Sequence, residues 1–524
     1  MKRRDFCKGL AVTFAAGTLA PAAALPQAGA ATALVGRAVP DDYYTLWYRS
    51  DRCGADLRHD YYYSDSLFDH PATEYDNQLA LATLGMAAAA DCTWESDQRY
   101  WMEGEVGRAD HIRDAFAKLG FTEVQLFNYT HSLNDTPDTV GCAIARKTLV
   151  RGGRQVTIIG AFLRGSGYGA EWSGNLHAGP GSAHVGFVTA ARQLVEKIRA
   201  YVQASAKRQP LGTLKLWMGG YSRGGGVANL VAARLPAVLP QLEKKNTFVY
   251  TFAAPASLTA ADCPDLQQDY DNNHAADGSL KKNWGTSNIF NIVSSGDVIP
   301  RILPAEWGFY RNGNDRFLPS TVIPEELQAL NDRSAGMEGT PIDFGRLAVS
   351  EETDAVLRSM MDLFCDRQTY YKGYEDAMRC MLQCATTRTE EEVTRGIVRD
   401  DAAVVAQLRS MELMQRFPQE KVERCVQAAS ALSRPVLEKL GSAVPLQAQQ
   451  IVIPMLAVGL CFELQPETVQ LVADFVLSTI TVKGQLSGIL KTVLCHFQEN
   501  YITVLEAYDP ADHGMTPYTR REEL

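Results

Sequence analysis

The hydrophobic and polar positions of this chain follow two different patterns. Before about residue 300, short apolar runs typical of buried strands alternate with segments whose apolar residues recur every three to four positions, as on one face of a helix. Strands that alternate with helices usually form parallel sheets, so we expect an α/β fold: a mostly parallel sheet with helices on both faces. The strands are expected at residues 141–149, 156–163, 214–218, 246–253 and 288–293.

Helices and one hairpin complete this first part. A glycine-rich turn at residues 151–154 is expected to join the first two strands. Residues 40–60 are rich in Tyr, Asp and Arg, and we expect them to wrap a surface. Apolar residues with helical spacing predict helices at residues 77–90, 111–119 and about 181–201.

From residue 301 the pattern changes, and between about 320 and 490 almost no strand signal remains. We therefore expect a large all-helical block inserted in the α/β core. An apolar run at residues 451–460 includes Pro454 and is too short to span a bilayer, so we expect it to be buried or interfacial. One helical face is apolar in the segments 353–365, 402–414, 422–440 and 468–480.

The segment around Ser222 carries the clearest chemical signal. The apolar run 214–218 is followed by G-Y-S-R-G at residues 220–224 and then by a helix of small residues. A G-x-S-x-G nucleophile elbow requires this strand–turn–helix order, because its tight turn leaves no room for a Cβ at either glycine. The serine then lies at a helix N-terminus, where backbone N–H groups favour an oxyanion. A glycine-rich turn with an incidental serine is the alternative.

Composition and charge narrow the class of protein. The 524 residues suffice for at least one full core, and 46% apolar with 21% charged residues is ordinary for a globular protein. A net charge of -10 argues against a nucleic-acid binder. Ten of the 11 cysteines follow residue 30 without paired C-x-x-C spacing, so we expect no zinc site; no metal and no cofactor is implied. Cys380 and Cys384, one helical turn apart, are expected to be buried thiols.

Residues 1–30 resemble a twin-arginine export signal. Arg3 and Arg4 precede an uncharged stretch that ends at a small-residue cleavage site, residues 28–30. The stretch is short for a membrane span, so we expect an exported protein (periplasmic, extracellular or at the cell surface) whose mature chain has no transmembrane segment. A general secretion signal or a basic cytosolic start is the alternative.

A series of short motifs follows in order along the chain: R-G-S at 164–166, W-x-x-N at 172–175, H-V-G-F at 184–187, the elbow, T-F-A-A-P at 251–255 and G-D-V-I-P at 296–300. Together they resemble the class 3 (fungal-type) lipase family of the α/β-hydrolase fold, over roughly residues 60–310 and the last thirty. Family members usually carry His and Leu on either side of the serine, where this chain has Tyr221 and Arg223. Arg223 is expected either to favour acidic groups in the substrate or to point outward.

A serine nucleophile needs an imidazole that a buried carboxylate holds in one tautomer. In α/β-hydrolases the order along the chain is serine, acid, histidine. Asp297 follows a predicted strand between small residues, and Asp262 and Asp265, in a polar loop, are the alternatives. Two histidines come later: His496, at the junction of two apolar helical stretches, and His513, in a polar tail. We expect His496 to be the base and keep His513 as the alternative.

The resemblance also implies the oxyanion donors, namely the backbone N–H groups of Arg223 and Ser166. Since 199 positions separate Asp297 from His496, the helical block is expected to emerge above the active site and to cover the acyl pocket as a cap or lid. The expected regions are 1–30 signal, 31–310 α/β-hydrolase core, 311–485 helical insertion and 486–524 C-terminal return with the histidine.

The sequence therefore predicts an exported serine hydrolase, a lipase or esterase that cleaves acylglycerol-like or other lipid esters through an acyl-enzyme. The substrate is a small lipid or ester molecule, and the cap is expected to contact a lipid interface transiently. The alternatives are a phospholipase, thioesterase or peptidase with the same triad, a non-catalytic lipid-binding module, and a secreted scaffold whose helical block binds a partner.

Overall fold

The computed structural model describes residues 37–50, 55–91, 104–105, 109–131, 138–166, 174–175, 184–259, 286–294, 297, 299–301, 309–318, 375–386, 397–440, 446–464 and 495–507. Several sequence-based expectations lie outside these residues. They are the signal at residues 1–30, the helices at 353–365 and 468–480, and the alternatives Asp262, Asp265 and His513.

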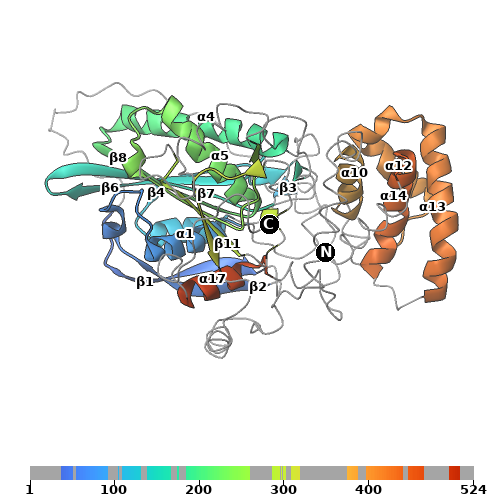
Figure 1. Ribbon diagram of the computed structural model, residues 1–524, viewed down its shortest axis with the longest axis horizontal. Helices are drawn as coiled ribbons and strands as arrows, with labels where there is room; N and C mark the ends of the chain where they lie inside the picture. Colours follow the sequence, from blue (N-terminus) through green and yellow to red (C-terminus); the bar gives the residue numbers. More distant parts are fainter. Residues whose placement is uncertain are drawn as a thin grey trace, which may run out of the picture. The chain divides into compact units, whose positions relative to one another are not determined.

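A seven-stranded sheet forms the centre of the α/β part (Figure 1), in the order β13-β11-β9-β8-β7-β6-β4. Neighbouring strands from β13 to β7 pair in parallel, and β6 pairs antiparallel with both β7 and β4. The expected mostly parallel sheet is therefore confirmed. The bounds are β4 Thr122–Phe127, β6 Cys142–Arg151, β7 Arg154–Leu163, β8 Thr213–Tyr221, β9 Thr247–Phe252, β11 Ile289–Ser294 and β13 Asn314–Leu318.

The hairpin between β6 and β7 forms where the sequence predicts it. Gly152 and Gly153 both have positive φ, +54° and +75°, as a two-residue type I′ turn demands. Arg151 pairs with Arg154 across this turn, and the pairing continues to Cys142 opposite Leu163. The hairpin places β7 inside the sheet, between β6 and β8, and the R-G-S motif directly follows the last residue of β7.

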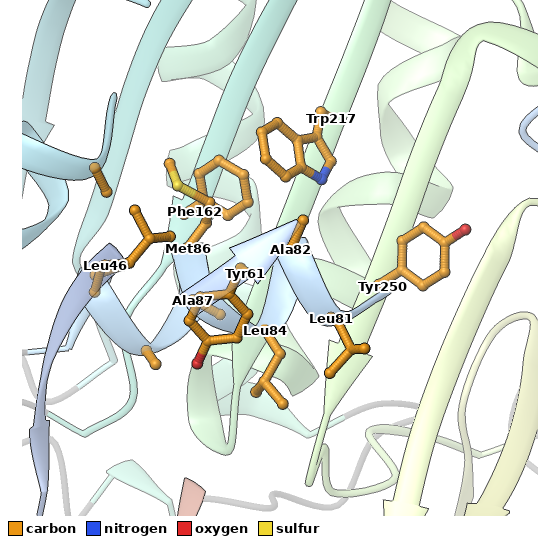
Figure 2. Close-up of a cluster of buried hydrophobic side chains, with 14 of the residues drawn as sticks. Leu46, Tyr61, Leu81, Ala82, Leu84, Met86, Ala87, Phe162, Trp217 and Tyr250 are labelled. Atoms are coloured by element: carbon orange, nitrogen blue, oxygen red, sulfur yellow. The ribbon is translucent and has the colours of Figure 1, made fainter. Parts of the chain in front are cut away.

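Helices cover both faces of the sheet (Figure 1). The helices α4 (Val185–Arg208) and α5 (Arg223–Val238) pack on one face, and α1 (Asn77–Ala90) packs on the other together with α17 (Gln498–Ala507). Side chains of β8 alternate between the two faces: Trp217 joins the cluster around α1, and Leu216 and Met218 join the cluster around α4 and α5. Figure 2 shows the first cluster.

The segment that was expected to wrap a surface forms a regular hairpin instead. The strands β1 (Asp42–Ser50) and β2 (Ala55–Tyr63) pair antiparallel, with Tyr48 opposite Leu57. Leu46, Tyr48, Tyr61 and Tyr63 alternate with more exposed residues and are buried in the cluster around α1. This hairpin explains why α1 is apolar on almost every side: the sheet covers one side of α1 and the hairpin covers another.

The described residues after 318 and before 495 form helices joined by short turns and irregular segments, without a strand among them, as expected. They include α10 (Glu375–Thr386), α12 (Asp401–Ser410), the 3₁₀ helix η8 (Glu412–Arg416), α13 (Gln419–Leu440) and α14 (Leu446–Cys461), which share an apolar cluster of their own. Cys380 and Cys384 are buried free thiols in that cluster. Among the described helices, none has the length and apolarity to cross a membrane. The sheet itself continues beyond the predicted core boundary at 310, because β13 pairs with β11.

Candidate active site

Ser222 occupies a strained turn between β8 and α5. Its φ of 54° and ψ of −124° lie outside the regions that L-residues favour, and such strain persists only where the surrounding structure enforces it. A Cβ on Gly220 would lie 2.4 Å from the Gly224 carbonyl oxygen, and one on Gly224 would lie 2.4 Å from the Arg164 carbonyl oxygen. Both glycines are therefore required for close backbone approach, and this turn has the geometry of a nucleophile elbow.

His496 links the serine to a carboxylate. Its Nε2 is 2.9 Å from Ser222 Oγ, and its Nδ1 is 2.8 Å from Asp297 Oδ2. Ser222 follows β8, Asp297 follows β11, and His496 precedes α17. The fold therefore brings His496 to Ser222, 274 positions earlier in the chain, and to Asp297, 199 positions earlier. His496 keeps 19% of its side chain exposed, whereas Asp297 is fully buried.

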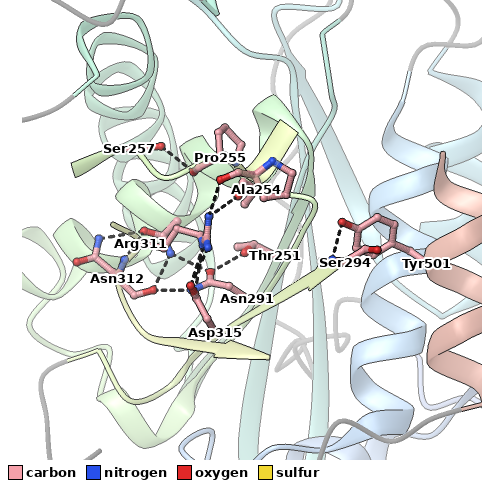
Figure 3. A network of polar contacts seen from close by, with 12 residues as sticks. Thr251, Ala254, Pro255, Ser257, Asn291, Ser294, Arg311, Asn312, Asp315 and Tyr501 are labelled. Carbon is pink, nitrogen blue, oxygen red and sulfur yellow. Dashed lines mark hydrogen bonds and ion pairs between the residues drawn. The ribbon is translucent and has the colours of Figure 1, made fainter. Parts of the chain in front are cut away.

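The buried Asp297 carboxylate is held by two further donors. The Ile299 N–H donates to Oδ1 over 2.9 Å, and the Tyr501 hydroxyl donates to Oδ2 over 2.8 Å. Figure 3 shows that the Tyr501 hydroxyl in turn accepts from the Ser294 N–H, at 3.0 Å. Burial, with the nearby Asp297 charge second, raises the pKa of Tyr501 well above its usual range. Tyr501 thus stays protonated as a donor, and Asp297 keeps its acceptor role toward His496.

A polar network beside the acid fixes the neighbouring loops (Figure 3). Nη1 of Arg311 donates to the carbonyl oxygens of Ala254, at 3.0 Å, and of Pro300, at 3.3 Å. The same guanidinium forms an ion pair with Asp315 on β13. The side chains of Arg311 and Asp315 are 4% and 10% exposed, respectively. One guanidinium thus joins the chain just after β9 to the turn at residues 299–301, which follows Asp297.

Tyr221, where family members usually have histidine, anchors His496. Its hydroxyl donates to the His496 carbonyl oxygen. Its ring lies 5.5 Å from the His496 ring and packs edge-on against Tyr501 at 5.6 Å. Burial raises the pKa of Tyr221 well above its usual range, so this donor also stays protonated. The residue before Ser222 thus fixes the backbone of the histidine that Ser222 contacts.

The loop after β7 approaches the elbow as the R-G-S motif implies. The Gly165 N–H donates to Asp91 Oδ1 over 2.5 Å, and Asp91 Oδ2 also accepts from Gln498, at the start of α17. Arg164 is buried and donates to the Gly165 carbonyl oxygen over 3.1 Å. Ser166, an expected oxyanion residue, follows directly and accepts from Asn175 at 3.0 Å. Asp91 joins two parts of the site and has no motif that would have identified it.

The expectation that the Arg223 side chain points outward is wrong, and its effect on substrate preference stays a prediction. Arg223 is only 1% exposed, so its guanidinium does not point outward. It donates to the Thr139 carbonyl oxygen and to Asn175, so the guanidinium links α5 to two segments beside the elbow. Its backbone lies in the first turn of α5, where N–H groups have no acceptor within the helix. Among the residues that the structure describes, no group of three or more His, Cys, Asp or Glu side chains is arranged to hold a metal ion.

Comparisons with known proteins point to one family. The family model described as "Lipase (class 3)" matches residues 165–307, which include the elbow and Asp297. No curated protein shows a significant match. Similar solved structures include a Rhizomucor miehei lipase propeptide complex at 20% identity, covering 46% of this chain and 68% of that chain with a TM-score of 0.31. Lipase II from Rhizopus niveus has 17% identity, 46% and 80% coverage and a TM-score of 0.30.

The family match covers the segment that carries most of the motifs found in the sequence, and it confirms the resemblance drawn from them. The same segment supplies the elbow serine and the aspartate that the structure joins through His496. Residues 165–307 thus match the class 3 lipase family model, and this match, together with the linked side chains of Ser222, His496 and Asp297, supports a serine ester hydrolase that acts on lipids.

Proposed function

We propose that Ser222 is the nucleophile, His496 the general base and Asp297 the residue that orients the base. The observation that carries this proposal is the unbroken pair of hydrogen bonds from Ser222 Oγ through the imidazole to Asp297. A serine hydroxyl attacks an ester efficiently only when a neighbouring base accepts its proton. Nδ1–H donation to Asp297 leaves Nε2 as the unprotonated nitrogen, which faces the hydroxyl.

The reaction then follows from these positions. Ser222 Oγ bonds to the ester carbonyl carbon while its proton passes to His496 Nε2, and the imidazolium is stabilised by Asp297. His496 returns that proton to the leaving alkoxide as the carbon–oxygen bond breaks, which leaves an acyl-enzyme and a free alcohol. A water molecule, deprotonated by the same nitrogen, then releases the carboxylic acid and restores Ser222.

The negative oxygen of each tetrahedral intermediate is assigned to two backbone N–H groups, those of Arg223 and Ser166. Arg223 is suited because it begins α5, whose N-terminal dipole favours negative charge. In the other loop, the Gly165 N–H already donates to Asp91, which supports Ser166 as the donor there. Losing one such donor typically lowers kcat by about 100- to 1,000-fold.

The proposal also includes export of the protein and contact of its helical block with lipid. The twin-arginine-like pattern of residues 1–30 supports export, and the helical block is assigned as a cap that contacts lipid. In its support, the helical block lies between Asp297 and His496 in the sequence, so its two ends lead to the site.

A chain-length series of p-nitrophenyl esters tests this function. The wild-type protein is expected to hydrolyse the series with a preference for medium or long acyl chains, and Ser222→Ala to lower kcat by about 10⁶-fold. The melting temperature of Ser222→Ala should match the wild type, since one hydroxyl is lost from a solvent-reachable site. Hydrolysis that persists in Ser222→Ala, or none of any ester by the folded wild type, would contradict the proposal.

A further inference from the structure

The side chain of Arg223 is bound beneath the site in a fixed orientation. Its Nε and Nη2 donate to the Thr139 carbonyl oxygen over 3.0 and 2.7 Å, and its Nη1 donates to Asn175 Oδ1 over 2.7 Å. The guanidinium carbon lies 5.1 Å from the centre of the Phe187 ring, at the start of α4. A buried guanidinium held on three nitrogens and one aromatic ring has a single orientation available to it.

That orientation determines which way the Asn175 amide points. A guanidinium has only donors, so the oxygen of the amide must face Arg223 and its nitrogen must face away. The amide nitrogen lies 3.0 Å from Ser166 Oγ. In this bond the serine oxygen accepts, and the hydroxyl hydrogen of Ser166 therefore points away from Asn175.

The backbone of Asn175 is held just as closely. His184 Nδ1 accepts from the Phe187 N–H over 3.3 Å, so the neutral ring carries its proton on Nε2. That Nε2 lies 2.9 Å from the Asn175 carbonyl oxygen and donates to it. Gly186 lets the start of α4 lie this close to residues 174 and 175, because a Cβ on Gly186 would lie 2.5 Å from the Gly174 carbonyl oxygen. Asn175 is thus held at its side chain and at its carbonyl oxygen, and it connects Arg223 of the elbow to Ser166.

We infer that Arg223 is a positioning residue for the oxyanion. Through Asn175 its side chain makes Ser166 Oγ an acceptor and so directs the Ser166 hydroxyl hydrogen to the negative oxygen of the intermediate, as a donor additional to the backbone N–H groups. The residue after the nucleophile would then serve the oxyanion twice, directly with its backbone and indirectly with its side chain. This inference rests on the proposed function, and it concerns a position where the related lipases usually carry leucine.

A double-mutant cycle between Arg223→Leu and Ser166→Ala tests the inference. If Arg223 acts through the Ser166 hydroxyl, Ser166→Ala lowers kcat by about 100-fold, and Arg223→Leu by about tenfold or more. The double variant should then lose no more than the larger single loss, with KM changed less than threefold. Losses that multiply in the double variant would overturn the inference.

Asn175→Asp provides a variant that keeps the shape of the site. An aspartate pairs with Arg223 at least as well as the amide does, but it accepts the Ser166 hydroxyl hydrogen instead of donating to the oxygen. We expect an unchanged melting temperature and a kcat at least fivefold below the wild type; a wild-type kcat would overturn the inference even if Arg223→Leu failed to fold. Ser222→Ala separates the two hypotheses, because activity that survives in it contradicts the proposed function itself.

Discussion

Replacing His496 by alanine is expected to lower kcat for ester hydrolysis by about 10⁶-fold, the scale seen when the base of a serine hydrolase triad is removed. His496 Nε2 is 2.9 Å from Ser222 Oγ, so the variant leaves the serine without a proton acceptor. The ring is partly exposed, and the Tyr221 ring packs beside it at 5.5 Å, so the fold should survive the change. Steady-state kinetics on a p-nitrophenyl ester, with a melting curve for each variant, measures both effects.

His513→Ala is the matched control for this experiment. It removes the other histidine that follows Asp297 in the sequence, and kcat is expected to stay within about twofold of the wild type, because His496 already supplies the base next to Ser222. The opposite pattern, with His513→Ala inactive and His496→Ala active, would assign the base to the alternative histidine. Equally small losses of kcat in both variants would show that neither histidine is the base.

The second large effect is expected for Asp297→Asn, with kcat lowered by about 10⁴-fold while the fold is kept. The Ile299 N–H can only donate, so it favours the asparagine oxygen at the Oδ1 position. The amide nitrogen then faces His496 and donates to Nδ1, which moves the imidazole proton to Nε2. An Nε2–H cannot accept the serine proton.

Kinetics and thermal melting together test this tautomer argument. Tyr501→Phe is its control, because it removes one donor to Asp297 Oδ2 but leaves the carboxylate and its bond to His496. We expect Tyr501→Phe to retain at least a hundred times the kcat of Asp297→Asn. An Asp297→Asn protein within tenfold of the wild type would show that the carboxylate does not orient the base.

The parts of the fold that the sequence predicts are those whose signals are local. The β6–β7 turn has two adjacent glycines, and the elbow has glycines two positions either side of the serine where any Cβ would meet backbone. The β1–β2 hairpin also had a signal, since Leu46 and Tyr48 are separated by one position and both are buried. Its many Tyr, Asp and Arg residues hid that alternation, because tyrosine rings fill a core while composition alone suggests a surface.

The same distinction holds for the residues of the site: those with a local sequence signal could be predicted, and those without one could not. Ser222 could be located from its own neighbourhood, and Asp297 and His496 from strand order and motif resemblance. The contacts of Tyr221 and Arg223 could not be predicted, because residue type does not determine the direction of a side chain whose partners lie 275 and 48 positions away. Both departures from the family pattern anchor other parts of the site: Tyr221 holds His496, and Arg223 holds Thr139 and Asn175.

The most direct test of the account is covalent labelling with a fluorophosphonate, which bonds only to a serine whose proton a neighbouring base can accept. Peptide mass spectrometry should find a single adduct on the peptide that contains Ser222 in the wild type and in His513→Ala. The adduct should be absent from Ser222→Ala and form far more slowly in His496→Ala. A folded wild-type protein that stays unlabelled at Ser222, or an equal adduct in Ser222→Ala, would contradict the assignment of Ser222 as the activated nucleophile.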